Sequence, residues 1–138
     1  MFNFAKLFDF FISFRQNFKT NFFDPLFFWY IKIYLSILLF INIIIWLIAG
    51  YLNMQMGEGL MALHYNVDFG INLIGEANKI YIIPLLGIII IIINTLLFIL
   101  VSRHKDKIFI SHILFITALI ANIILLVSTA SIYLINFR

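Results

Sequence analysis

From Leu63 to Leu73 every odd position is apolar and every even position is polar or glycine. This period of two predicts a β-strand with one apolar face and one face that carries His64, Asn66, Asp68 and Asn72. These side chains can donate or accept hydrogen bonds, or carry charge. We interpret the stretch as a candidate interaction loop, whose residues are His64, Tyr65, Asn66, Asp68, Phe69 and Asn72.

The spacing of His64 and Asp68 argues against a metal site. Four residues of strand span about 13 Å, and only a helix would bring these two side chains together. The same two residues, with Ser128, Thr129 and Ser131, supply the residue types of a catalytic triad, but nothing in the spacing places them together. We therefore predict a protein that is not an enzyme and has neither metal nor cofactor.

One asparagine lies deep in each of three long apolar segments: Asn42, Asn94 and Asn122. At 1.5 Å per residue their depths overlap at roughly 12 to 21 Å, so their amides could form interhelical polar contacts. A polar path for an ion or a substrate is the alternative. The absence of deep charged residues in these segments favours packing contacts.

The composition is that of an integral membrane protein, with 64% hydrophobic residues, 11% charged residues and a mean hydropathy of +1.13. A soluble domain carries about 25% charged residues. Cysteine is absent, which excludes disulfides and thiolate sites. The net charge of +3 is small, and the positive charges lie mainly on one side of the predicted membrane spans. We therefore expect no nucleic-acid partner.

We divide the chain into an amphipathic helix over residues 1–24 and a membrane domain over residues 25–138. The helix has polar residues three or four apart opposite a row of Phe and Leu, which predicts that it lies among lipid headgroups. Packing against a helix of another protein is the alternative. Asp24 and Pro25 then form a helix start.

The membrane domain contains three predicted spans, at about 31–51, 80–101 and 108–133, each long enough for a hydrocarbon core of about 30 Å. Residues 52–79 form the loop between the first two spans. The fold class is therefore an all-α membrane protein with three transmembrane helices, an interfacial helix before them and a loop of β-hairpin character.

The predicted hairpin has a short first arm from Leu52 to Met56, a turn at Gly57-Glu58-Gly59 and a second arm from Leu60 to Leu73. Because the second arm is longer, its far half is expected to lack a partner within the loop. A helical alternative gathers apolar residues on one face, but it leaves Tyr65, Phe69 and Leu73 on the other face.

Lysine and arginine residues are distributed unequally around the spans. Seven lie on the amino-terminal side and two on the other: Lys6, Arg15, Lys19, Lys32, Arg103, Lys105 and Lys107 against Lys79 and Arg138. The positive-inside rule then predicts a cytoplasmic amino terminus, with the loop and the carboxyl terminus extracytoplasmic.

The motif Leu-His-Tyr-Asn-Val-Asp-Phe-Gly-Ile-Asn-Leu-Ile-Gly at residues 63–75, followed by Ile-Pro-Leu-Leu-Gly at 83–87, resembles a pattern in small uncharacterised bacterial multi-span membrane proteins. The resemblance covers about the second half of the chain. It implies a location in the bacterial inner (cytoplasmic) membrane and supplies no activity, cofactor or functional residue.

These patterns lead to two functional hypotheses. The first is a scaffold or accessory subunit of a membrane complex, whose loop pairs with a membrane-protein partner or with its own copy. Strand edges that lack a partner recruit other strands. The second is a small oligomeric channel or carrier with a polar path lined by the three asparagines.

Overall fold

The computed structural model describes residues 28–57, 59–66, 68 and 70–137, with the backbone alone for Tyr65, Asn66 and Asn72. Its elements are α2 (Trp29–Met56), β1 (Leu60–Asn66), β2 (Gly70–Glu76), the short 3-10 helix η3 (Ala77–Tyr81), α3 (Ile82–Val101) and α4 (Lys107–Phe137). The predicted amphipathic helix over residues 1–24 lies outside this part of the chain.

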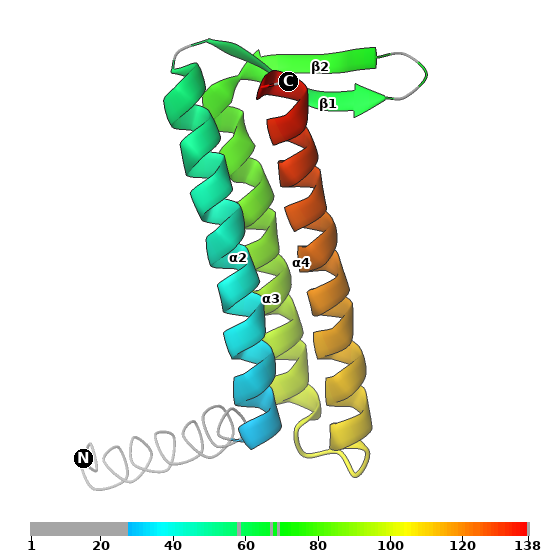
Figure 1. Ribbon diagram of the computed structural model, residues 1–138. Helices are drawn as coiled ribbons and strands as arrows, with labels where there is room; N and C mark the ends of the chain where they lie inside the picture. The colour runs from blue at the N-terminus through cyan, green and yellow to red at the C-terminus, as the bar shows by residue number, and fades with distance from the viewer. Residues whose placement is uncertain (1–27, 58, 67, 69, 138) are drawn as a thin grey trace, which may run out of the picture.

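The three long helices stand side by side, and each contacts the other two (Figure 1). The hairpin β1–β2 crosses one end of the bundle, where α4 finishes (Figure 1). All three helices are apolar and long enough to cross a membrane, and the second of these spans, Ala77–Val101, includes η3 as well as α3. The prediction of three helices that are apolar and long enough to span a membrane, together with a small antiparallel sheet, is thus confirmed.

The helices pack through a narrow seam. Its buried positions recur three, four or seven residues apart: Ile31, Leu38, Asn42, Ile45, Ala49 and Leu52 in α2, Pro84, Gly87, Ile91 and Phe98 in α3, and Ser111, Phe115, Ala118, Asn122, Thr129 and Ile132 in α4. This spacing keeps one face of each helix turned toward its neighbours. Many of the large apolar residues elsewhere on the helices are exposed, as a lipid environment allows.

The apolar part of the seam falls into two clusters. One lies toward the α3–α4 turn and includes Phe98 and Phe115. The other lies under the hairpin and joins Leu52 of α2, Met61 of β1, Ile80 of η3 and Ile132 of α4. Asn42 and Asn122 occupy the seam between these clusters, so the centre of the bundle is polar.

The hairpin is antiparallel, with Leu60 opposite Glu76 at its base and Asn66 opposite Gly70 near its turn. The register is irregular around His64, where Leu63 and Asn72 have no assigned partner. Gly70 begins β2 with a φ of 72°, a left-handed conformation that glycine adopts without steric cost.

Three details of the predicted loop are wrong. The first arm, Leu52 to Met56, is the last part of α2 rather than a strand. The glycine turn ends that helix, with Gly57 at a φ of 58° and its N–H bonded to the Asn53 carbonyl at 3.0 Å. The second arm folds back on itself, so its far half pairs with its near half instead of lacking a partner.

The helical alternative for this loop is also wrong, because the segment forms two strands. The helices α2 and α4 extend a few residues beyond the predicted spans. α2 runs from Trp29 to Met56 rather than 31–51, and α4 runs from Lys107 to Phe137 rather than 108–133. These extra turns bring the ends of α2 and α4 up to the hairpin.

Candidate functional site

A polar contact joins all three helices at the centre of the bundle. The Asn42 side-chain amide of α2 donates to the Pro84 carbonyl of α3 at 3.0 Å and, in a longer and weaker bond, to Asn122 Oδ1 of α4 at 3.5 Å. Asn122 donates to the Ala118 carbonyl of its own helix at 3.0 Å. Asn42 and Asn122 are only 3% and 0% exposed, so the contact is buried and all of its partners belong to the same protomer.

Gly87 of α3 makes this contact possible. A Cβ atom at residue 87 would overlap the Asn42 amide nitrogen and lie 2.7 Å from Asn122 Oδ1. Any larger residue would therefore force the two buried amides, or α3 itself, to move. The absence of a side chain at Gly87, rather than its backbone freedom, allows the three helices to meet here.

Asn94, the third predicted polar residue, does not join this contact. It lies further along α3 toward the α3–α4 turn, is half-buried, and donates to the Ile90 carbonyl of its own helix at 2.9 Å. The structure therefore brings two of the three asparagines together and leaves the third bonded to its own backbone.

A fourth asparagine, which the sequence did not single out, fastens the hairpin to the bundle. Asn136, in the last turn of α4, donates to the Ala62 carbonyl at 2.9 Å, and it accepts the Ala62 N–H on its Oδ1 at 3.0 Å. Its amide thus pairs with β1 as the backbone of a third strand would. The edge of β1 that faces away from β2 is therefore occupied by Asn136 at Ala62.

The same two bonds show which backbone groups of β2 face outward. In an antiparallel pair, opposite residues either exchange both backbone bonds or both point away from each other. Ala62 points toward Asn136 and away from β2, and its opposite residue is Ile74. The N–H and C=O of Ile74 therefore point away from β1, along the outer edge of β2.

This outer edge of β2 is the candidate interaction site. Within the described residues the sheet contains only β1 and β2, so no third strand covers β2. The side chains of Ile71, Leu73 and Ile74 are 48%, 54% and 59% exposed. An edge of this kind presents unpaired backbone donors and acceptors together with apolar side chains.

The predicted loop residues are spread along the hairpin. His64, Tyr65 and Asn66 lie on β1 and Asn72 lies on β2, while the exposed Asp68 belongs to the turn and Phe69 is outside the described residues. In the part of the chain that the structure describes, no group of three His, Cys, Asp or Glu residues is placed to hold a metal ion.

The hydroxyl groups near the hairpin bind to their own helix. Thr129 Oγ1 donates to the Leu125 carbonyl at 2.8 Å, and Ser131 Oγ donates to the Val127 carbonyl at 2.9 Å. Thr129 is fully buried and Ser131 is exposed. Both hydroxyls therefore serve as local helix contacts in this structure.

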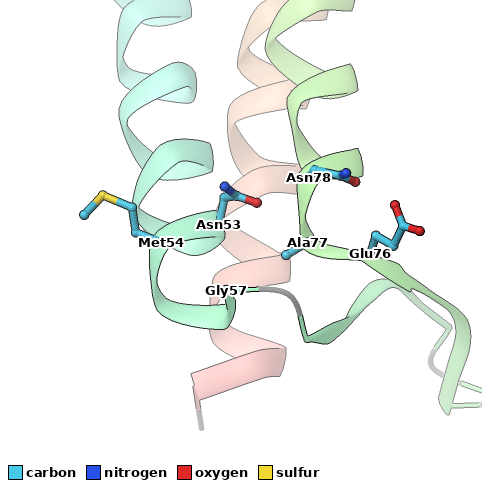
Figure 2. Close-up of a pocket in the computed structure, with 6 residues that line it drawn as sticks. All are labelled: Asn53, Met54, Gly57, Glu76, Ala77 and Asn78. Carbon is cyan, nitrogen blue, oxygen red and sulfur yellow. The ribbon is translucent and has the colours of Figure 1, made fainter.

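A cleft of about 650 Å³ lies between the end of α2 and the start of η3. Its lining residues are Asn53, Met54, Gly57, Glu76, Ala77 and Asn78. Figure 2 shows Asn53 and Ala77 between the two elements, whereas the side chains of Glu76 and Asn78 extend away from α2. A ligand site needs polar groups that converge on one point, and these do not.

Aromatic residues surround His112 at the opposite end of the bundle. The Tyr34 hydroxyl and His112 Nδ1 are 2.9 Å apart and share a hydrogen bond between α2 and α4. The Tyr30 ring lies 5.6 Å from the imidazole, and Lys107 lies 5.0 Å above the Phe28 ring. This cluster ties the two helices together at the end that is predicted to be cytoplasmic.

Comparisons with known proteins leave the family open. A scan of protein-family models, a search of curated proteins and a search of solved structures gave no significant match. The resemblance to small bacterial multi-span membrane proteins therefore stays a prediction, and function must be argued from the geometry of the hairpin and the bundle.

Proposed function

We propose that this protein is a non-enzymatic scaffold or accessory subunit of a complex in the bacterial inner membrane, and that its partner adds a strand to the outer edge of β2. The amino terminus is cytoplasmic and the hairpin is extracytoplasmic in this proposal. The partner is another membrane protein or a second copy of the chain.

The asymmetry between the two hairpin edges carries the proposal. Asn136 occupies the edge of β1, whereas the Ile74 backbone groups on β2 point outward. Residues 60–76 contain no Lys, Arg or Pro, which are the residues that commonly block strand pairing at an edge. A two-stranded hairpin is only marginally stable by itself, so a further strand would also stabilise this one.

The orientation of the hairpin supports a partner in the same membrane. The strands run across the helix axes, and hence along the membrane plane if the helices span it (Figure 1). A second copy inserted in the same sense is rotated about the membrane normal, which reverses the strand direction. Two β2 strands would then meet antiparallel, and a register centred on Leu73 would pair all of Gly70–Glu76.

The central polar contact favours this proposal over a channel or carrier. A pore between protomers needs polar side chains at the protomer surface. Asn42 and Asn122 are buried inside one protomer and bonded to its own groups. Their arrangement is that of a packing contact, which membrane helices commonly use.

Replacing Ile74 tests the proposal. Ile74→Pro removes the outward N–H of residue 74 and leaves every backbone bond between β1 and β2 in place. Ile74→Val keeps that N–H. We expect native mass spectrometry of tagged protein, purified in mild detergent, to show a defined complex for the wild type and for Ile74→Val. For Ile74→Pro we expect free protomer.

The proposal fails if Ile74→Pro retains the same complex, or if the wild type yields monomer alone. Amide exchange in β1 serves as the control for folding. If β1 is protected equally in the proline and valine variants, the hairpin is intact and loss of the complex reports on the β2 edge.

A further inference from the structure

One face of the hairpin covers the end of the bundle. Met61 of β1 points into the cluster with Leu52, Ile80 and Ile132 and is fully buried. Its opposite residue on β2 is Gly75, which is also buried. Because side chains alternate along a strand, Leu73 and Ile71 lie on the same face as Gly75.

This apolar face extends beyond the helices. The hairpin continues past α4 on its way to the turn (Figure 1). Burial on this face falls in the same direction, from Met61 at 0% exposed, through the half-buried Leu63, to Leu73 and Ile71 at about half exposed. An apolar hollow of about 240 Å³, lined in part by Leu63, Leu73, Ile74 and Ile132, lies where the hairpin leaves the bundle.

Aromatic residues place this overhang at the height of the membrane interface. Tyr51 of α2 lies 6.1 Å from Tyr133 of α4 at the hairpin end of the bundle, and Tyr81 of η3 stacks at 5.6 Å on Trp46, which lies five residues before Tyr51 in α2. Tyrosine and tryptophan concentrate at the headgroup level of membrane proteins. Tyr51 lies five residues before the end of α2, so the hairpin is only about 8 Å above it.

We propose that the overhanging half of the hairpin rests its apolar face, through Ile71 and Leu73, on the lipid interface of the leaflet that surrounds this end of the bundle. The occupant of the face is phospholipid, in continuity with the lipid around the helices. The opposite face, which carries the exposed Leu60, is turned to water. The hairpin is thereby held along the membrane surface with its β2 edge directed sideways.

Single cysteines can test this inference cleanly, because the chain contains no native cysteine. We would prepare Ile71→Cys and Leu73→Cys, with Leu60→Cys as the control on the opposite face, and attach a nitroxide label to each. The full-length variants would be placed in phosphatidylethanolamine and phosphatidylglycerol vesicles. Collision rates would be measured with oxygen, which concentrates in lipid, and with a water-soluble nickel chelate.

We expect labels at 71 and 73 to show an oxygen-to-nickel ratio several-fold higher than a label at 60. Equal ratios on both faces would overturn the inference, because the two faces would then share one environment. Shielding of 71 and 73 from both reagents would also overturn it, because protein would then cover the face. All three sites are about half exposed or more, and a variant counts only if its melting temperature matches the wild type.

This inference is independent of the proposed partner. It concerns the face of the hairpin that carries Ile71 and Leu73, whereas strand addition concerns the backbone edge at Ile74. Lipid contact without a complex, or a complex without lipid contact, would separate the two.

Discussion

Gly87→Ala is expected to destabilise the bundle, whereas Gly50→Ala is expected to leave its stability unchanged or slightly higher. A Cβ atom at residue 87 would overlap the Asn42 amide and crowd Asn122 Oδ1. A Cβ atom at Gly50, in α2, would meet nothing within 4 Å. The two substitutions add the same methyl group to a helix and differ only in their surroundings.

The expected cost at Gly87 combines overpacking with the loss of hydrogen bonds. Forcing an extra carbon into a packed site costs about 1 to 3 kcal/mol. Separation of α3 from α2 would also weaken the bond from Asn42 to the Pro84 carbonyl. At Gly50 an alanine meets no clash, and its higher helix propensity adds up to about 1 kcal/mol to the stability of the helix.

Thermal unfolding of both variants in the same detergent measures this difference. We expect Gly87→Ala to melt at a clearly lower temperature than the wild type and Gly50→Ala to melt at the same or a higher temperature. Equal melting temperatures for the two variants would show that the helices do not meet at Gly87 as the structure has them.

Asn136→Leu is expected to loosen the hairpin while the bundle stays folded. The Asn136 amide makes two bonds to Ala62, and each such bond contributes about 0.5 to 1.5 kcal/mol. Their loss should accelerate hydrogen exchange throughout β1 and β2 on the order of tenfold to a hundredfold, since about 1.4 kcal/mol corresponds to a factor of ten. Exchange in α2 and α3 should change little.

Asn94→Leu is the matched control for this experiment. It removes the same side chain, but the Asn94 amide donates only to the Ile90 carbonyl of its own helix. The hairpin should then exchange as in the wild type. If Asn136→Leu left hairpin exchange unchanged, or if Asn94→Leu accelerated it equally, the attachment of β1 by Asn136 would be refuted.

The long apolar segments were predictable from the sequence because lipid imposes one strong requirement, a run of apolar residues that forms its own backbone hydrogen bonds. The ends of the helices were less predictable. Leu52 to Met56 alternates as a strand would, yet it continues α2, because Leu52 is buried against Met61 and Ile80 in the cluster under the hairpin. A five-residue pattern cannot reveal that contact.

The hairpin was predictable from its alternation, but its turn was misplaced. Gly57 and Gly59 gave the more obvious turn signal and were assigned to the hairpin, although Gly57 ends a helix. The segment from Asn66 to Gly70 contains Asn, Asp and Gly within five residues, which is also a turn signal. Recognising it would have divided the long second arm into the two strands that the structure shows.

The depth of each asparagine along its helix was enough to predict that Asn42 lies near Asn122, because this depth depends only on the helix rise. It was insufficient for Asn94, whose amide binds its own backbone. Asn136 lay beyond the predicted third span and was therefore overlooked. It follows Asn122 by fourteen residues, two heptads on the same face of α4, and that spacing was a usable signal.

Hydrogen exchange at the Ile74 amide tests the central claim most directly, because this N–H points away from β1 and is paired only if a partner strand is present. We expect it to exchange slowly in protein extracted from native membranes with its surrounding lipid and partners, and rapidly in the isolated protomer. The amides that pair β1 with β2 should be protected alike in both samples. Rapid exchange at Ile74 in both samples would contradict strand addition at the β2 edge, and with it the proposed role as an accessory subunit.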